Sequence, residues 1–99
     1  MPKNSVRVVA RLIAREDSIE KVRVVLTALV DSSRSEPGCV SYELLQNSAA
    51  GSDFTFIEEW ETDAALDAHL ETAHFHEAAT KLQKILASEP DIRRYRQIA

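Results

Sequence analysis

The sequence predicts an α+β fold of the ferredoxin-like type, βαββαβ, in which a four-stranded antiparallel sheet carries its helices on one face. Segments with strand and helix patterning follow one another in that order along the 99 residues. Two of the strands are apolar on both sides, which is typical of central strands. Two right-handed crossovers then place both helices on the same side of the sheet. A chain of this length builds one core and therefore one domain.

The first strand is predicted at residues 6–14, VRVVARLIA. Its apolar side chains point both ways, because Val8 falls on one face and Val9 and Ile13 on the other. Helices cover only one face of a ferredoxin-like sheet, so the second apolar face needs another cover. A second copy of the chain is the simplest cover, and the sequence therefore predicts a homodimer that associates through the sheet faces.

Residues 17–34 are predicted to form the first helix, since their apolar side chains recur at intervals of three and four and make one stripe. This stripe is expected to face the sheet. Pro37 cannot continue a helix, and Gly38 tolerates the backbone conformation that a return turn needs. The chain therefore turns back before the next strand.

Residues 39–47 are predicted to form a strand near an edge, because polar and apolar side chains alternate cleanly, with Val40 and Tyr42 on the same face. A hairpin loop rich in Ser, Gly and Asp follows. Residues 54–61 are predicted to form the next strand, in which aromatic and β-branched side chains leave neither face wholly polar. This strand is expected to lie in the centre of the sheet.

The second helix is predicted in two pieces. Thr62 or Asp63 caps the first piece, and Thr72 caps the second, whose apolar face continues until Pro90 ends it. Residues 92–98 are predicted to form the last strand, and its arginines suit an exposed edge.

Composition excludes several classes of function. The net charge of -4 argues against binding to nucleic acid, which needs clustered lysine and arginine. No apolar run approaches the roughly 18 residues that cross a bilayer, so no membrane partner is expected. Cys39 is the single cysteine and the N-terminus lacks the pattern of a secretion signal, which favours a cytoplasmic protein. The common nucleotide-binding and metal-binding motifs are absent from the sequence.

His69 is the candidate catalytic residue. It lies three residues after Leu66 and next to Leu70, on or beside the buried stripe of its helix. An imidazole with a pKa near neutrality suits proton abstraction, although a packed histidine bonded to a backbone carbonyl has the same pattern. His74 lies at the break between the helical pieces, where it either enters the pocket or caps the turn.

The histidines do not predict a metal site. His69, His74 and His76 are spaced across a helix break, and this spacing does not place them on one helix face as an i, i+4 pair would be placed. We therefore expect no metal.

The aromatic candidates for substrate binding are Trp60, Tyr42 and Phe75, and each of them either contacts an aromatic ligand or fills the core. Glu58 shares strand parity with Trp60, so its carboxylate is expected to point the same way and to pair with Arg7 or Arg11.

Three segments, EPGCVSYEL, EEWET and AALDAHLETAHF, together resemble the antibiotic biosynthesis monooxygenase (ABM) domain over residues 6–98. This resemblance implies a dimeric α+β barrel. It also implies an oxygenase that acts on polycyclic phenols or quinols without metal or organic cofactor. Trp60 matches the Trp of the third strand in the family, and His69 matches its recurrent AxH. The haem-degrading members carry Trp and His where this chain has His69 and Ala79, so haem degradation is not implied.

The expected function is that of a cofactor-independent monooxygenase that oxidises a quinol or polycyclic phenol with O2. Such an enzyme needs a base to deprotonate a small aromatic or quinone-like molecule and dry walls to hold the anion. One alternative is an isomerase of a small phosphorylated carbonyl compound, which would need arginines such as Arg93, Arg94 or Arg96 to bind phosphate. The other alternative is a non-catalytic dimer that binds a hydrophobic metabolite.

Overall fold

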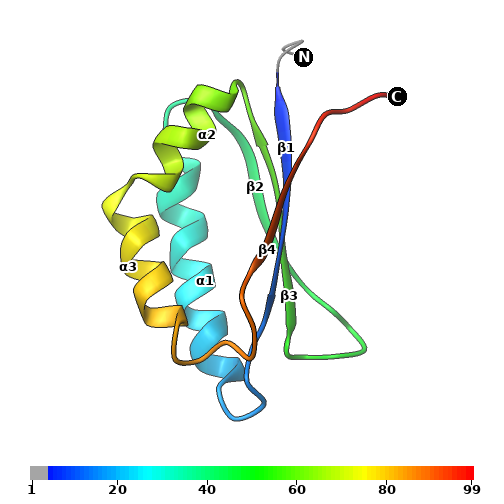
Figure 1. Cartoon of the computed structure of the whole chain (residues 1–99), viewed down its shortest axis with the longest axis vertical. Coiled ribbons are helices and arrows are strands. Elements are labelled where there is room, and N and C mark those ends of the chain that lie inside the picture. Colours follow the sequence, from blue (N-terminus) through cyan, green and yellow to red (C-terminus); the bar gives the residue numbers. More distant parts are fainter. Residues whose placement is uncertain (1–4) are drawn as a thin grey trace.

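The elements follow the predicted order in the computed structural model, which describes residues 5–99. They are β1 (Val6–Ile13), α1 (Ile19–Arg34), β2 (Cys39–Gln46), β3 (Asp53–Trp60), α2 (Asp63–Leu70), α3 (Ala73–Leu82) and β4 (Asp91–Tyr95). The strands form one antiparallel sheet in the order β2-β3-β1-β4, and the helices lie together on one side of it (Figure 1). The predicted α+β fold is confirmed, with the first and third strands in the middle of the sheet.

The core lies between the helices and the inner face of the sheet. On β1, Val8 and Leu12 point into this core, opposite Glu58 and Phe54 of β3. The predicted stripe of α1 packs on them; its buried members include Val22, Leu26, Leu29 and Val30. Burying an apolar side chain of this size stabilises the fold by roughly 1.5–3 kcal/mol. No helix within residues 5–99 has both the length and the apolar content that crossing a membrane requires.

A β-bulge changes which side chains of β2 point into the core. The pairing with β3 shifts between Cys39 and Ser41, so one extra residue stands on the β2 side. Tyr42 points inward and is 2% exposed, whereas Val40 is 46% exposed. Strict alternation predicted that these two side chains share a face. That prediction is wrong because the bulge breaks the two-residue period between them.

The second helical piece ends earlier than predicted. α3 stops at Leu82, and the chain then turns instead of continuing as a helix to Pro90. Backbone bonds to the end of β1 replace the helical ones: Arg15 donates to the Ile85 carbonyl, and Ala87 donates to the Ile13 carbonyl. The apolar residues that follow Leu82 are therefore held by the sheet edge rather than by a helix.

The outer face of the sheet carries no helix (Figure 1). Val9, Ile13 and Ile57 are only partly buried there. Arg7 and Glu59 form an ion pair on the same face, with 3.5 Å between Arg7 Nε and Glu59 Oε1. This distance is too long for a good hydrogen bond, and Arg7 Nε and Glu59 Oε2 are buried atoms without a hydrogen-bond partner among residues 5–99. The partly buried apolar side chains and the polar atoms without hydrogen bonds indicate that packing of a second protein surface on this face would stabilise the fold.

Replacing Gly38 with alanine is expected to lower the free energy of unfolding by about 2 kcal/mol or more. Gly38 has a φ of 83°, a left-handed conformation that costs a residue with a Cβ roughly 1–2 kcal/mol. The new Cβ would also lie 2.5 Å from the Cβ of Ala65 in α2. Urea unfolding of the variant measures the loss.

Gly51→Ala is the matched control for this measurement. A Cβ at Gly51 would have Gln46 Nε2 at 3.5 Å, an ordinary contact, and Gly51 does not have a positive φ. Its unfolding free energy is expected to stay within about 0.5 kcal/mol of the wild type. Equal losses in the two variants would contradict the assigned role of Gly38.

Candidate functional site

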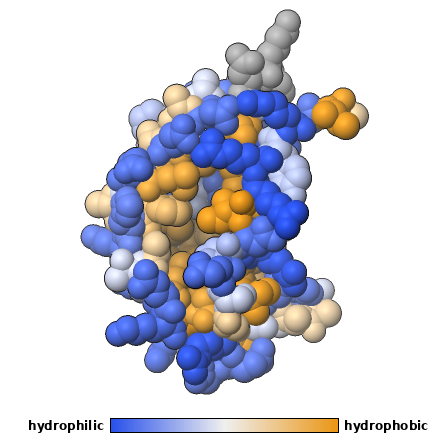
Figure 2. Space-filling model, in the orientation of Figure 1, coloured by the Kyte–Doolittle hydropathy of each residue, from blue (hydrophilic) through white to orange (hydrophobic). Residues whose placement is uncertain are grey.

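A cavity of about 570 Å³ lies between the helices and the inner face of the sheet. Its walls are mainly apolar side chains from the central strands and the three helices, and the segment before β4 closes one side. Figure 2 shows the hollow between the helices and β4, lined by hydrophobic residues and rimmed by hydrophilic ones. The polar residues at its wall are Tyr42, Glu58, His69, Gln83, Ser88, Glu89 and Arg94.

His69 lies in the last turn of α2, and its side chain is turned inward and almost completely buried. This burial agrees with its predicted position on or beside the buried stripe of the helix. Thr62 caps the start of this short helix by accepting a hydrogen bond from the Ala65 amide. The Thr72 hydroxyl donates to the His69 carbonyl at 2.8 Å, which fixes the end of the helix. The imidazole ring then packs against Trp60, with ring centroids 4.7 Å apart.

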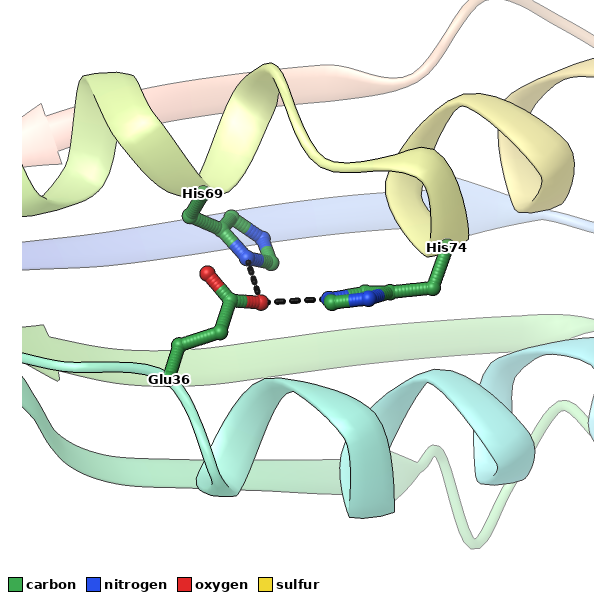
Figure 3. A group of neighbouring side chains, drawn as sticks. All are labelled: Glu36, His69 and His74. Atoms are coloured by element: carbon green, nitrogen blue, oxygen red, sulfur yellow. Dashed lines mark hydrogen bonds and ion pairs between the residues drawn. The ribbon is translucent and has the colours of Figure 1, made fainter.

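Glu36 brings the two helical pieces together at one carboxylate oxygen. It lies in the turn between α1 and β2, and its Oε2 accepts hydrogen bonds from His69 Nδ1 at 2.9 Å and from His74 Nε2 at 2.5 Å. In Figure 3 the two histidines reach this oxygen from either side of the break between α2 and α3. His74 is about one-third exposed, whereas the other two side chains are largely buried.

The surroundings of His69 favour its neutral form. Burial lowers the pKa of His69, and the hydrogen bond and charge of Glu36 oppose that effect only in part. A carboxylate oxygen accepts, so Nδ1 carries the proton and Nε2 is left with its lone pair. An imidazole held in this way can take a second proton at Nε2.

Glu58 is a second titratable group at the cavity wall. Burial raises the pKa of its carboxyl from 4.5 to about 7, while the hydrogen bond from Trp60 lowers the pKa and the charge of Glu36 raises it. The Trp60 indole donates to Glu58 Oε1 at 2.9 Å. A carboxyl group that titrates near neutrality can exchange a proton with a ligand.

The predicted ion pair of Glu58 with Arg7 or Arg11 is wrong. Those arginines lie on the outer face of β1, where Arg7 pairs with Glu59 and Arg11 with Asp53. Glu58 points to the inner face instead, because it shares the parity of Trp60. Its partner is therefore the indole and not a guanidinium.

The structure divides the other predicted binding residues into two groups. Tyr42 and Phe75 line the cavity, and burial raises the pKa of Tyr42, so its phenol stays protonated. Trp60 is fully buried behind His69, and His74 contacts Glu36; neither residue lies at the cavity wall. His76 is exposed on α3, outside the cluster around Glu36.

The sequence did not identify Glu36 as a site residue, and it predicted an ion pair for Glu58 rather than a place at the cavity wall. The parity that Glu58 shares with Trp60 was the signal for an inward carboxylate. No comparable signal marked Glu36, because a glutamate before Pro37 reads as an ordinary turn residue.

Carboxylates bind the two arginines of β4 and Arg96, which follows directly after the strand. Arg94 donates to Asp67 at 2.7 Å, and Arg96 donates to Asp63 at the same distance. Arg93 pairs with Asp91 on the other face of β4. An incoming phosphate would have to compete with these ion pairs.

The sequence model of a family described as Antibiotic biosynthesis monooxygenase matches residues 5–81. The chain is 35% identical over 82 residues to "Uncharacterized protein sll1783" of Synechocystis, an alignment that covers 83% of this chain and 56% of that protein. It thus spans little more than half the length of this relative.

Two further similarities come from a sequence and a solved structure. The chain is 36% identical over 70 residues to "Putative monooxygenase Rv0793" of Mycobacterium tuberculosis, covering 71% of this chain and 68% of that protein. The crystal structure of PA3566 from Pseudomonas aeruginosa superposes with a TM-score of 0.92 at 30% identity, covering 100% of this chain and 99% of the other.

Proposed function

Because the chain belongs to the antibiotic biosynthesis monooxygenase family, we propose that it is a monooxygenase that uses no metal or organic cofactor and oxidises a quinol or a polycyclic phenol with O2. The observation that carries the proposal is a buried imidazole, His69, which lies at the wall of an apolar cavity and is bonded through Nδ1 to Glu36. The similarity to "Putative monooxygenase Rv0793" adds support.

His69 is the proposed base. Its Nε2 takes a proton from the hydroxyl group of the bound substrate, and Glu36 stabilises the imidazolium that forms. The reaction requires neutral His69, and the lowered pKa supplies that form near neutral pH. His74 acts through Glu36 and is a positioning residue.

The deprotonated substrate supplies all the electrons for the reaction. It passes one electron to O2, and the two radicals combine at carbon as a peroxide. Loss of water then turns this ring C–H carbon of the substrate into a quinone carbonyl, with one oxygen atom of O2 in the product and one in water. The apolar walls, to which Tyr42 and Phe75 contribute rings, keep solvent from the anion.

Glu58 is the proposed partner for the second proton transfer. Its carboxyl pKa of about 7 allows it to give a proton to the departing peroxide oxygen at neutral pH. Trp60 is a positioning residue in this scheme, because its indole holds Glu58 and its ring supports His69.

We also propose a homodimer in which the outer sheet faces meet. Val9, Ile13 and Ile57 supply the apolar area of this interface. Arg7 and Glu59, which form an ion pair, supply two buried atoms that lack a hydrogen-bond partner within residues 5–99. Light scattering at micromolar concentration is expected to give twice the chain mass of 11.1 kDa. A mass equal to one chain would contradict this interface.

Oxygen uptake tests the proposed activity. Metal-free protein is expected to speed oxygen consumption with a dihydroxyanthracene or a hydroquinone above the uncatalysed rate. Uptake equal to the uncatalysed rate across a panel of such substrates would contradict the proposal.

The same compounds distinguish the alternative functions. Binding of these compounds without turnover would assign the cavity to a non-catalytic binder instead. Inhibition by inorganic phosphate would favour the isomerase, but the ion pairs of Arg94 and Arg96 argue against it.

A further inference from the structure

Three ligand atoms of the kinds that bind zinc converge beside the cavity. Glu36 Oε2, His69 Nδ1 and His74 Nε2 all lie within 4.8 Å of one another. They come from the α1–β2 turn, the end of α2 and the start of α3, as Figure 3 shows. We propose that these residues form a site for a divalent transition-metal ion of the zinc type.

The helix break explains why the two histidines can share an ion. Within one straight helix, residues five apart point in different directions. Here Thr72 ends one helical piece by donating to the His69 carbonyl and begins the next by accepting from the Phe75 amide. The chain changes direction between His69 and His74, so both rings face the same carboxylate.

The donor set matches zinc chemistry. Zn²⁺ binds imidazole nitrogen and carboxylate oxygen at about 2.0–2.2 Å, so ligand atoms around a tetrahedral ion stand roughly 3.3 Å apart. The two contacts with Glu36, at 2.9 and 2.5 Å, are shorter than this because hydrogen bonds hold the cluster closed. An entering ion replaces both of these protons and lengthens each contact with Glu36 by less than about 1 Å.

The three side chains have complementary roles in such a site. His69 is fixed in place by its packing against Trp60 and Phe75, with ring centroids 4.7 and 5.2 Å away. His74 is 32% exposed, which gives it room to move and gives the ion a path of entry. Three protein ligands leave a fourth position for water or another small ligand.

Metal binding would interfere with the proposed oxygenase. An ion on His69 Nδ1 takes the lone pair of that nitrogen, and the ring must then carry its proton on Nε2. The lone pair that the proposed base uses would be lost. Bound Zn²⁺ is therefore expected to act as an inhibitor and not as a cofactor of the reaction.

Calorimetry with Zn²⁺ and visible absorption with Co²⁺ test the site directly. Untagged, metal-free wild-type protein is expected to bind one ion per chain at micromolar concentration, and Co²⁺ is expected to give the absorption of a low-coordinate complex. His74→Ala and Glu36→Gln are each expected to weaken binding at least about tenfold. His76→Ala is the control, because His76 lies on the same helix but outside the cluster, and it is expected to bind as the wild type does.

Two outcomes would overturn the proposal. One is the absence of stoichiometric binding at micromolar Zn²⁺ in the wild type. The other is wild-type affinity in His74→Ala or Glu36→Gln, with far-ultraviolet circular dichroism showing that the variants are folded. These measurements use no substrate, so they stand whether or not the protein consumes oxygen.

Discussion

His69→Gln is expected to lower substrate-dependent oxygen uptake by about 100-fold or more. General acid–base catalysis contributes roughly 10²–10⁴-fold to a rate, and glutamine cannot accept the proton that the proposed mechanism transfers. The amide of glutamine is also a hydrogen-bond donor, so the variant keeps a group that can pair with Glu36. Initial rates of oxygen consumption, corrected for the uncatalysed reaction, measure the effect.

The loss should fall on kcat and not on substrate affinity, because the proton transfer belongs to the transition state. His76→Gln is the matched control, since it removes an exposed histidine from the neighbouring helix. That variant is expected to keep the wild-type rate. If His69→Gln kept the wild-type kcat in a folded protein, His69 would be a packed core histidine and the base would have to be sought elsewhere.

The free energy of unfolding is expected to fall as the pH rises from about 4.5 to about 7. Burial raises the pKa of Glu58 from 4.5 to about 7, so between these values the folded state keeps a proton that the unfolded chain has lost. Raising the pH then favours unfolding. The stability linked to this group is fully present below about pH 4.5 and is lost as the pH rises through about 7. The loss is expected to reach about 3 kcal/mol.

Glu58→Gln is expected to abolish this part of the pH dependence, because a neutral amide has no proton to lose. Its Oε1 can still accept from the Trp60 indole, so the variant should fold. Urea unfolding at intervals between about pH 5 and pH 8 measures the slope in both proteins. Above about pH 7 the variant is expected to be more stable than the wild type.

Glu43→Gln supplies the control for this series, because it removes an exposed carboxylate from β2. It is expected to follow the wild-type slope. Parallel curves for wild type and Glu58→Gln would show that Glu58 does not titrate in this range in the folded protein.

The sequence by itself determined the arrangement of the fold. The apolar residues on both faces of β1 and β3 placed these strands in the middle, and the sheet order agrees. The spacing of the apolar stripe around Leu66 also placed His69 inside, where it is found. These predictions succeeded because burial of a strand or helix face follows a local period, which a sequence displays directly.

Predictions from local periodicity were wrong where pairing with another element determines the backbone conformation. The bulge at Cys39 to Ser41 exposes Val40, and backbone bonds to β1 end α3 at Leu82. Neither event has a signal within its own segment. Both depend on which backbone groups of another element come within hydrogen-bonding distance.

Only the tertiary structure decided what surrounds the imidazole. Glu36 stands 33 residues before His69 and 38 before His74, and no period links them. The turn after α1 and the break between α2 and α3 come together only when these three helices pack on the sheet. The proton on Nδ1 of His69 and the grouping of three possible metal ligands are consequences of that packing, because contacts between distant segments exist only in the folded chain.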